Sequence, residues 1–471
     1  MTTSVKTRVL ILGGGFGGLY AALELEKTLA NDPAIEITLV NKDNFFLFTP
    51  LLHEVAASDL DITTIVSPLR MLLKRVRFFD GDVEAIDLKK KTVLVSHGRE
   101  HHHHDLPYDY LLIALGAVTN LHMIPGEENA LTMKSLGDAI HLRNRLIELL
   151  EAADFDCFPE ARAPLMTVVV AGGGFAGVET VASVNDFLRD ALKHYSNLRE
   201  DMLRVVLIHS GDVILPELGP KLGAYAQTKL AGRNVEIRTK STVTSFRGSV
   251  VEIQDGTKIN TNTLVWTAGI SPNPLLESLA CPKDRGKIVV NDFLEVTGHP
   301  GVWALGDSAC VPDSSTGRHC PPTAQHAFRQ GIVAGKNITA AIRGGKTVPF
   351  RFKTIGALAS IGRRTGVARL FGVNFSGFIA WWMWRTIYLS KLPRFEKKLR
   401  VALDWTLDLL FAKNLVQFET LRATSVSHRH DLEAEAPPAA RGATLHPVIR
   451  RRRLPRHPVL RKAAPRKRKR K

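Results

Sequence analysis

Cysteine is scarce in this sequence, with four residues among 471. They are Cys157, Cys281, Cys310 and Cys320, and no two of them have the CxxC or CxxxxC spacing of a redox-active dithiol or a local zinc motif. Scattered free thiols are typical of a reducing compartment. The tract His101–His104 has few carboxylates at ligand spacing, so we expect it to be an exposed loop. We therefore expect no dithiol active site and no metal site.

Long hydrophobic runs are also missing. The stretch FIAWWMW (378–384) has seven apolar residues before Arg385, whereas a helix that spans a bilayer needs about 20. After Pro393, apolar residues recur at helical spacing beside basic ones: Leu399, Ala402, Leu403, Thr406, Leu407 and Leu410. Such an amphipathic stretch with tryptophan nearby is typical of a segment that lies in a membrane interface. We expect this of residues 376–411, with packing on the protein's own core or across a homodimer as the alternative.

Acidic residues are absent from residues 440–471, which hold 14 of the 63 Lys and Arg residues. The formal net charge of the whole chain is +17, so the remainder carries only +3. A segment rich in Pro, Arg and Lys cannot bury enough apolar surface to order itself. We predict a disordered basic tail over 421–471, which is either a solvated extension or a tether to anionic lipid or to nucleic acid. Because the charge is confined to this tail, nucleic acid is the less favoured partner.

One motif occurs twice in the chain. RVLILGGGFGGLYAALEL (8–25) and TVVVAGGGFAGVETVASVNDF (167–187) each join a β-branched run, a glycine cluster and an Ala-rich stretch at helical spacing. In a βαβ unit these glycines permit a tight turn, the approach of a pyrophosphate and close packing of helix on strand. The helix N-terminus then offers free N–H groups to the phosphates. Two such motifs predict two dinucleotides in one chain, one of which takes electrons from the other.

The order of the segments predicts how the two units are connected. WALGDSA (303–309) places an acidic residue, Asp307, at a strand end, which suits the ribityl hydroxyls of a flavin. It belongs with the first unit, so the second unit is inserted into the first. LLIALGA (111–117) and LVWTAGI (264–270) resemble each other as crossings between the two. We predict an α/β fold of two Rossmann-like domains and a C-terminal amphipathic helical segment, with these boundaries: FAD domain 1–125 and 289–345, NAD(P)H domain 126–288, C-terminal segment 346–420.

Four segments sharpen this interpretation: NKDNFFLFTPLLHEVA (41–56), GGGFAGVE (172–179), AQHAFRQG (324–331) and KLRVALDWTLDLLF (398–411). Over residues 5–420 the chain resembles the type II NADH dehydrogenases among the two-dinucleotide flavoproteins. The resemblance implies FAD on the first unit and NADH on the second. It also implies reduction of a membrane quinone, without proton pumping, by a peripheral protein on the cytoplasmic side of the cell membrane. A soluble NAD(P)H reductase of a small redox protein is the alternative, and it would not need the Trp-rich C-terminus.

The resemblance further implies roles for individual residues. For FAD these are Gly13, Gly14, Gly15, Gly17, Gly18, Asn41, Lys42, Thr49 and Asp307. For the nicotinamide nucleotide they are Gly172, Gly174, Gly177, His209 and Gly269. Glu179 and Gln325 would be catalytic, with Glu179 as a proton source, and Gln325 and Phe328 would line the quinone site.

Three of these residues have structural alternatives. Glu179 could complement the dipole in the first turn of a helix. Gln325 could bond backbone groups at a helix start, and Asp307 could be a plain N-cap.

Three positions depart from the family pattern. The strand after each glycine loop usually ends in an acid that bonds the ribose hydroxyls, but Asn41 and His209 stand there. An Asn amide oxygen can still accept one such bond. Without a carboxylate at His209, nothing repels a 2′-phosphate, so NADPH stays open beside NADH. Arg329 replaces a second glutamine, which alters the expected shape of the quinone site.

Overall fold

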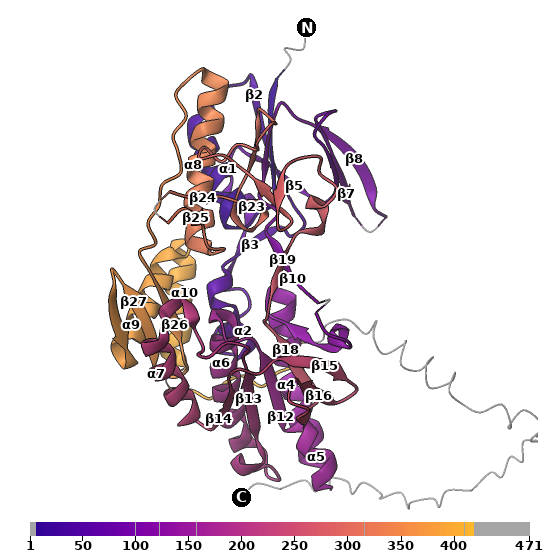
Figure 1. Ribbon diagram of the computed structural model, residues 1–471, viewed down its shortest axis with the longest axis vertical. Coiled ribbons are helices and arrows are strands. Elements are labelled where there is room, and N and C mark those ends of the chain that lie inside the picture. Colours follow the sequence, from indigo (N-terminus) through magenta and orange to yellow (C-terminus); the bar gives the residue numbers. More distant parts are fainter. Residues whose placement is uncertain are drawn as a thin grey trace, which may run out of the picture. The chain divides into compact units, whose positions relative to one another are not determined.

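The computed structural model describes residues 6–98, 100–121, 123–156, 158–314, 316–408 and 410–418 (Figure 1). The predicted basic tail at 421–471 lies outside these residues. Two five-stranded parallel sheets form the frame of the described part, as the two glycine motifs predict.

The first sheet combines strands that are far apart in the sequence. Its spatial order is β22 (Val302–Ala304), β9 (Tyr110–Ile113), β1 (Thr7–Leu12), β2 (Ile35–Asn41) and β5 (Arg77–Asp80), all parallel. The run Val9–Leu12 is fully buried, as expected of a parallel sheet that is covered on both faces. Helix α1 (Phe16–Thr28) lies against α8 (Ala324–Arg343) so closely that a Cβ on Gly331 would come within 2.2 Å of the Gly17 carbonyl oxygen.

All strands of the second sheet lie in the sequence between β9 and β22. Its spatial order is β11 (Leu131–Thr132), β18 (Thr263–Trp266), β12 (Thr167–Ala171), β13 (Arg204–Ile208) and β14 (Val235–Arg238). Its principal helices are α4 (Leu136–Phe155), α6 (Phe175–Ala191) and α7 (Pro220–Ala231). Strands β10 (Ala117–Thr119) and β19 (Ile270–Pro272) pair antiparallel, so the segments that follow LLIALGA and LVWTAGI lie side by side.

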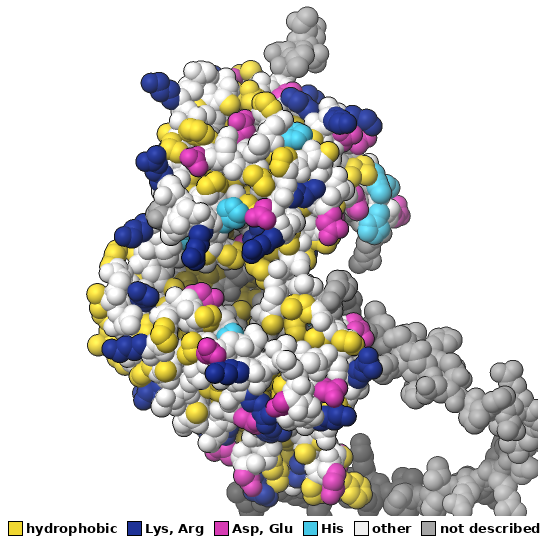
Figure 2. All heavy atoms as spheres, in the orientation of Figure 1, with side chains coloured by type: hydrophobic (Ala, Val, Ile, Leu, Met, Phe, Trp, Pro, Cys, Tyr) yellow, Lys and Arg dark blue, Asp and Glu magenta, His cyan; other side chains and the backbone are white. Residues whose placement is uncertain are grey.

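Further strands and α-helices lie between residues 45 and 319. They are β3 (Phe45–Leu47), α2 (Leu52–Ala56), β4 (Val66–Pro68), α3 (Leu69–Leu72), β6 (Asp82–Asp87), β7 (Thr92–His97), β8 (His102–Pro107), α5 (Pro159–Leu165), β15 (Val243–Arg247), β16 (Val250–Ile253), β17 (Lys258–Asn260), β20 (Lys283–Asp284), β21 (Lys287–Val289), β23 (Ala309–Cys310), β24 (Pro312–Asp313) and β25 (Arg318–His319). The histidine tract is exposed as expected, but the prediction of a loop is wrong, because three of its residues form the start of β8. They pair with β7, whose backbone hydrogen bonds hold this polar segment as a strand. Figure 2 shows histidine side chains gathered on the surface in this part of the molecule.

The C-terminal segment contains a sheet that the sequence analysis did not predict. Strands β26 (Gly356–Ser360), β27 (Gly366–Leu370) and β28 (Val373–Ser376) are antiparallel and precede α9 (Gly377–Lys391) and α10 (Phe395–Leu407). In α10, Val401 and Trp405 are buried, whereas Leu399, Leu403 and Leu407 are about half exposed. The predicted apolar stripe therefore faces away from the core. Within the described ranges, no helix combines the length and the hydropathy that crossing a bilayer requires.

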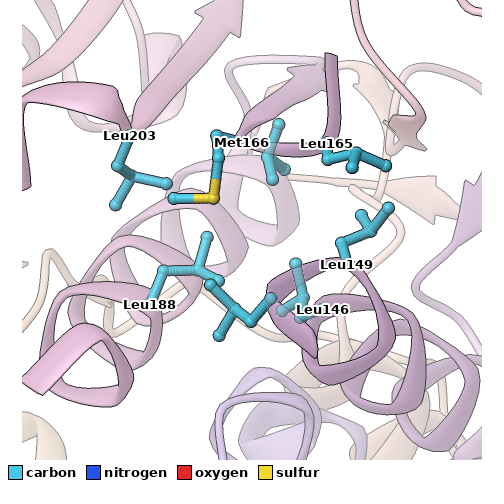
Figure 3. A pocket seen from close by; sticks show the side chains of 8 residues that line it. Leu146, Leu149, Leu165, Met166, Leu188 and Leu203 are labelled. Atoms are coloured by element: carbon cyan, nitrogen blue, oxygen red, sulfur yellow. The ribbon is translucent and has the colours of Figure 1, made fainter. Parts of the chain in front are cut away.

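A small cavity lies between α4, α6 and β12 of the second sheet (Figure 3). Its lining is apolar: Leu146, Leu149, Leu150, Leu165, Met166, Val168, Leu188 and Leu203. Its volume is about 10 Å³, which is at the lower limit for a single water molecule. It is therefore a packing gap in the core and not a ligand site.

Candidate functional site

The two glycine loops have the same backbone geometry. Gly13 and Gly172 have φ values of +100° and +113°, which favour glycine, and a Cβ on either would overlap the chain that follows β9 or β18. A Cβ on Gly15 or Gly174, by contrast, would meet no heavy atom within 4 Å. Each of these two residues directly precedes a helix, so the free N–H groups of the first turn border open space. Both loops fit the pyrophosphate of a dinucleotide.

Asn41 and His209 occupy matching positions at the ends of β2 and β13. The amide Oδ1 of Asn41 accepts a hydrogen bond from the N–H of Gly14 at 2.7 Å, and Nδ1 of His209 accepts one from the N–H of Gly173 at 3.2 Å. An imidazole whose Nδ1 accepts carries its proton on Nε2 when neutral. Each side chain thus braces its glycine loop, a role that the sequence analysis missed.

The segment around Asp307 lies against the first glycine loop. A Cβ on Gly17 would come within 2.1 Å of a Leu305 methyl carbon, and the N–H of Gly306 donates to Oε1 of Gln330 in α8 at 2.8 Å. Oδ2 of Asp307 is 3.7 Å from Nζ of Lys134. Leu305 occupies the N-cap position of the single-turn helix Gly306–Ser308, and Asp307 lies inside that helix. The N-cap alternative for Asp307 is therefore wrong.

Lys42 and Thr49 are both exposed. Lys42 directly follows β2, and Thr49 begins the turn that leads into α2. Gly269 has a φ of +79° after β18 and lies beside the side chain of Met123.

Glu179 is a buried carboxyl and not a first-turn residue of α6. Its Oε1 accepts hydrogen bonds from the Ser360 N–H at 3.1 Å and from Nε1–H of Trp384 at 3.0 Å. Burial raises its pKa to about 8, although the two hydrogen bonds oppose the shift. The carboxyl is therefore mostly neutral at pH 7. Because both donors bond Oε1, its proton remains on Oε2.

His53 lies beside that oxygen, with Nδ1 at 3.8 Å from Oε2 of Glu179. Burial lowers the pKa of His53 to about 3, so this contact joins two neutral groups at pH 7 and is not an ion pair. Nε2 of His53 is buried and has no hydrogen-bond partner among the described residues. This ring nitrogen is therefore available for a hydrogen bond to water or to a ligand.

A second buried carboxyl, Glu54, repeats this arrangement. Its Oε2 accepts a hydrogen bond from Nε1–H of Trp405 in α10 at 2.7 Å, and burial, followed by the nearby Asp59, raises its pKa. The rings of Trp384 and Trp405 are 6.2 Å apart. We call Glu54, Glu179, His53 and these two tryptophans the buried carboxyl cluster. Of these five residues, the sequence pattern indicated only Glu179, although His53 and Glu54 stand within the LFTPLLHEVA segment.

Gln325 connects α8 to the C-terminal sheet. Its Nε2 donates to the Gly356 carbonyl of β26 at 3.1 Å and makes no bond to its own helix end. Gly356 and Ser360 are the two ends of β26, so Gln325 and Glu179 bond to backbone groups about 13 Å apart along one strand. Phe328 packs edge-on against Tyr20 with ring centroids 4.3 Å apart, and the Arg329 guanidinium lies over Phe352.

Two family models match this chain. One is described as pyridine nucleotide-disulphide oxidoreductase and covers residues 7–331. The other is described as NDH2 C-terminal domain and covers residues 355–414, which contain β26 to α10. The second match does not favour the soluble-reductase alternative.

The chain is also similar to named proteins and to a solved structure. The type II NADH:quinone oxidoreductase Ndh of Mycobacterium tuberculosis is 32% identical over 462 residues, which cover 93% of this chain and 96% of that protein. The demethylphylloquinone reductase NdbB of Synechocystis sp. is 32% identical over 412 residues, covering 86% and 96%. The structure of NDH2 from Plasmodium falciparum in complex with NADH has a TM-score of 0.81 at 20% identity, covering 87% of this chain and 100% of that one. The chain therefore belongs to the type II, non-proton-pumping NADH:quinone oxidoreductases, within a superfamily whose members use FAD and NADH.

Proposed function

We propose that NADH:quinone oxidoreduction takes place where the first glycine loop, α8 and β26 meet, with Glu179 as proton donor to the quinone. The observation that carries this proposal is a neutral, buried carboxyl fixed by two hydrogen bonds to Oε1. A carboxylic acid whose pKa lies near the working pH is suited to proton transfer. Gln325, Phe328 and the open side of His53 complete the proposed quinone site.

We assign FAD to the first loop and the nicotinamide nucleotide to the second. The FAD set is Gly13, Gly14, Gly15, Gly17, Gly18, Asn41, Lys42, Thr49 and Asp307, and the nucleotide set is Gly172, Gly174, Gly177, His209 and Gly269. Open space at Gly15 and the contact between Gly17 and Leu305 support the first set. When bound, FAD supplies the redox centre between NADH and quinone. The chain's own residues bind and orient FAD, NADH and the quinone, and they exclude water from the site. The proposed domains keep the predicted boundaries: 1–125, 126–288, 289–345 and 346–420.

We infer that NADPH is also accepted, because His209 replaces the acid that would repel a 2′-phosphate. Replacing His209 with Asp keeps an acceptor for the Gly173 N–H and adds a negative charge. We expect kcat/KM for NADPH to fall roughly tenfold, equivalent to about 1.4 kcal/mol, and that for NADH to stay nearly constant. Asn41→Asp is the matched control in the first loop and should leave the coenzyme preference unchanged. Equal losses for both coenzymes would contradict the proposal.

We propose that α9 and α10 dock on the cytoplasmic side of the cell membrane. Hydrophobic side chains gather over α9 and the adjacent sheet (Figure 2). Seven large apolar residues on the two helices are about half exposed or more: Phe378, Ile379, Trp382, Phe395, Leu399, Leu403 and Leu407. A patch of this kind with basic neighbours fits an anionic lipid surface. The basic tail would add a salt-sensitive attraction. A homodimer through the same helices is the competing proposal.

Replacing Leu399, Leu403 and Leu407 together with serine should release the protein from lipid vesicles. Each of these leucines is about half exposed, so its burial in lipid contributes about 1 kcal/mol. Loss of all three, about 3 kcal/mol, should weaken partitioning roughly 100-fold. NADH oxidation with a water-soluble quinone analogue should continue. Vesicle flotation measures the first effect, and size-exclusion chromatography shows whether a dimer dissociates instead. The matched control is truncation after Ala439, which should remove only the salt-sensitive part of binding. Unchanged flotation of the triple variant would overturn the membrane proposal.

A further inference from the structure

Three residues with metal-binding side chains meet at a place that no sequence motif marks. Asp284 ends β20, Cys310 ends β23 and His319 ends β25. One ligand atom from each lies within 4.8 Å of the others. Nδ1 of His319 is 3.7 Å from Oδ2 of Asp284. The thiol is buried, and the other two side chains are about half exposed, so the cluster opens to solvent on one side.

The local topology brings these residues together. Strand β21 lies between β20 and β23, so Asp284 and Cys310 are on two strands of one small sheet. The Cys310 thiol donates to the backbone carbonyl of Asp284 at 3.4 Å. The hairpin β24–β25 then returns the chain, and its pairing of Pro312 with His319 brings the imidazole close to the strand that ends in Cys310.

We propose that Asp284, Cys310 and His319 form a binding site for Zn²⁺, with solvent as the fourth ligand. A thiolate, an imidazole and a carboxylate are the ligand types that zinc takes at about 2.0–2.3 Å, and a tetrahedral set then has ligand atoms about 3.3–3.8 Å apart. The separation between His319 and Asp284 already falls within that range. On binding, the Cys310 S–H bond is broken, its proton passes to solvent and the sulfur bonds the metal.

The surrounding charge is compatible with this cation. Arg285 and Lys287 are close enough to act on the Cys310 thiol and would repel a metal ion. One thiolate and one carboxylate, however, neutralise the two positive charges of zinc, so the occupied cluster adds no net charge beside these cations.

The location connects two parts of the proposed active site. Cys310 lies three residues after Asp307, and His319 lies six residues before Gln325. A metal ion at this site would fasten the hairpin that leads into α8 to the strand that follows Asp307.

The test uses FAD-loaded full-length protein titrated with Co²⁺, which substitutes for Zn²⁺ and gives a near-ultraviolet charge-transfer band when bound to thiolate. We expect this band in the native protein, its displacement by Zn²⁺, and a rise in melting temperature with Zn²⁺. Cys310→Ala should abolish the band, and His319→Ala should weaken the affinity at least tenfold. Since His319 is on the surface, its variant remains informative if Cys310→Ala fails to fold.

Two controls separate this site from other metal binding. Cys281→Ser removes a partly exposed thiol outside the cluster and should leave the band unchanged. The exposed histidines of β8 can bind Co²⁺ but have no thiolate, so they give no such band. Absence of the band from native protein at millimolar Co²⁺, or its persistence in Cys310→Ala, would overturn the proposal. NADH oxidation is measured separately, so loss of the metal site and failure of the proposed catalytic site are distinguishable.

Discussion

A Gly15→Val variant should fold and yet lose its flavin. Gly15 has φ −74° and ψ −166°, an extended conformation open to any residue, and a side chain there would meet no protein atom within 4 Å. The valine would instead fill the space proposed for the pyrophosphate. We expect FAD retention to fall more than about tenfold, since a loss of only about 1.4 kcal/mol suffices. Absorbance of the purified protein measures this directly.

Gly174→Val is the matched control in the second loop. Its backbone is also extended, with φ −76° and ψ −172°, and its surroundings are equally open. This variant should keep FAD but resist reduction by NADH in stopped-flow experiments. If both variants lose flavin to the same extent, the assignment of the two loops fails.

Glu179→Gln should slow quinone reduction by about 100-fold, the lower range for removal of a general acid. The glutamine can keep an oxygen in the position of Oε1, where Ser360 and Trp384 donate. It also preserves the neutral charge that the carboxyl has at pH 7, since burial raises the pKa of Glu179 to about 8. FAD content, melting temperature and flavin reduction by NADH should stay nearly constant.

The pH profile distinguishes a proton donor from a structural residue. In the native protein, Glu179 is protonated below its pKa, so reoxidation of the flavin by quinone should slow as the pH rises through about 8. The Gln variant should lack this step. A loss of several kcal/mol in stability without a change in the pH profile would indicate that Glu179 serves the fold alone.

Local patterns were sufficient to predict the nucleotide-binding frame. β-Branched runs before glycine clusters predict strand, loop and helix within about 20 residues, and both loops have the expected geometry. The motif WALGDSA (303–309) predicted that Asp307 belongs with the first unit, and Leu305 of this motif lies against Gly17. Each of these motifs is a short run of neighbouring residues, so it can be recognised in a single sequence.

The partners of the buried carboxyls could not be predicted in this way. Trp384 bonds Glu179 across 205 positions, and Trp405 bonds Glu54 across 351. Nothing in the local sequence distinguishes these buried tryptophans from tryptophans that lie in a membrane interface. A membrane interface was the location predicted for this region. The sheet β26–β28 was missed because its strands are short and its glycines resemble those of loops. Asp284, Cys310 and His319 were missed because their spacing follows no compact metal motif.

The indole bonds of α9 and α10 have a consequence for modular engineering. An anchor that is only an appendage can be exchanged between relatives as a cassette. Here the two helices donate hydrogen bonds to Glu54 and Glu179, so grafting them from another protein also replaces one wall of the buried carboxyl cluster. Consider a chimera that keeps the native nucleotide-binding domains but takes a C-terminal segment that lacks both tryptophans. In this chimera, the buried carboxyls of Glu54 and Glu179 would lose their indole hydrogen-bond donors. The exposed apolar surface of the two helices is thus constrained on their opposite, buried side by the hydrogen bonds to Glu54 and Glu179.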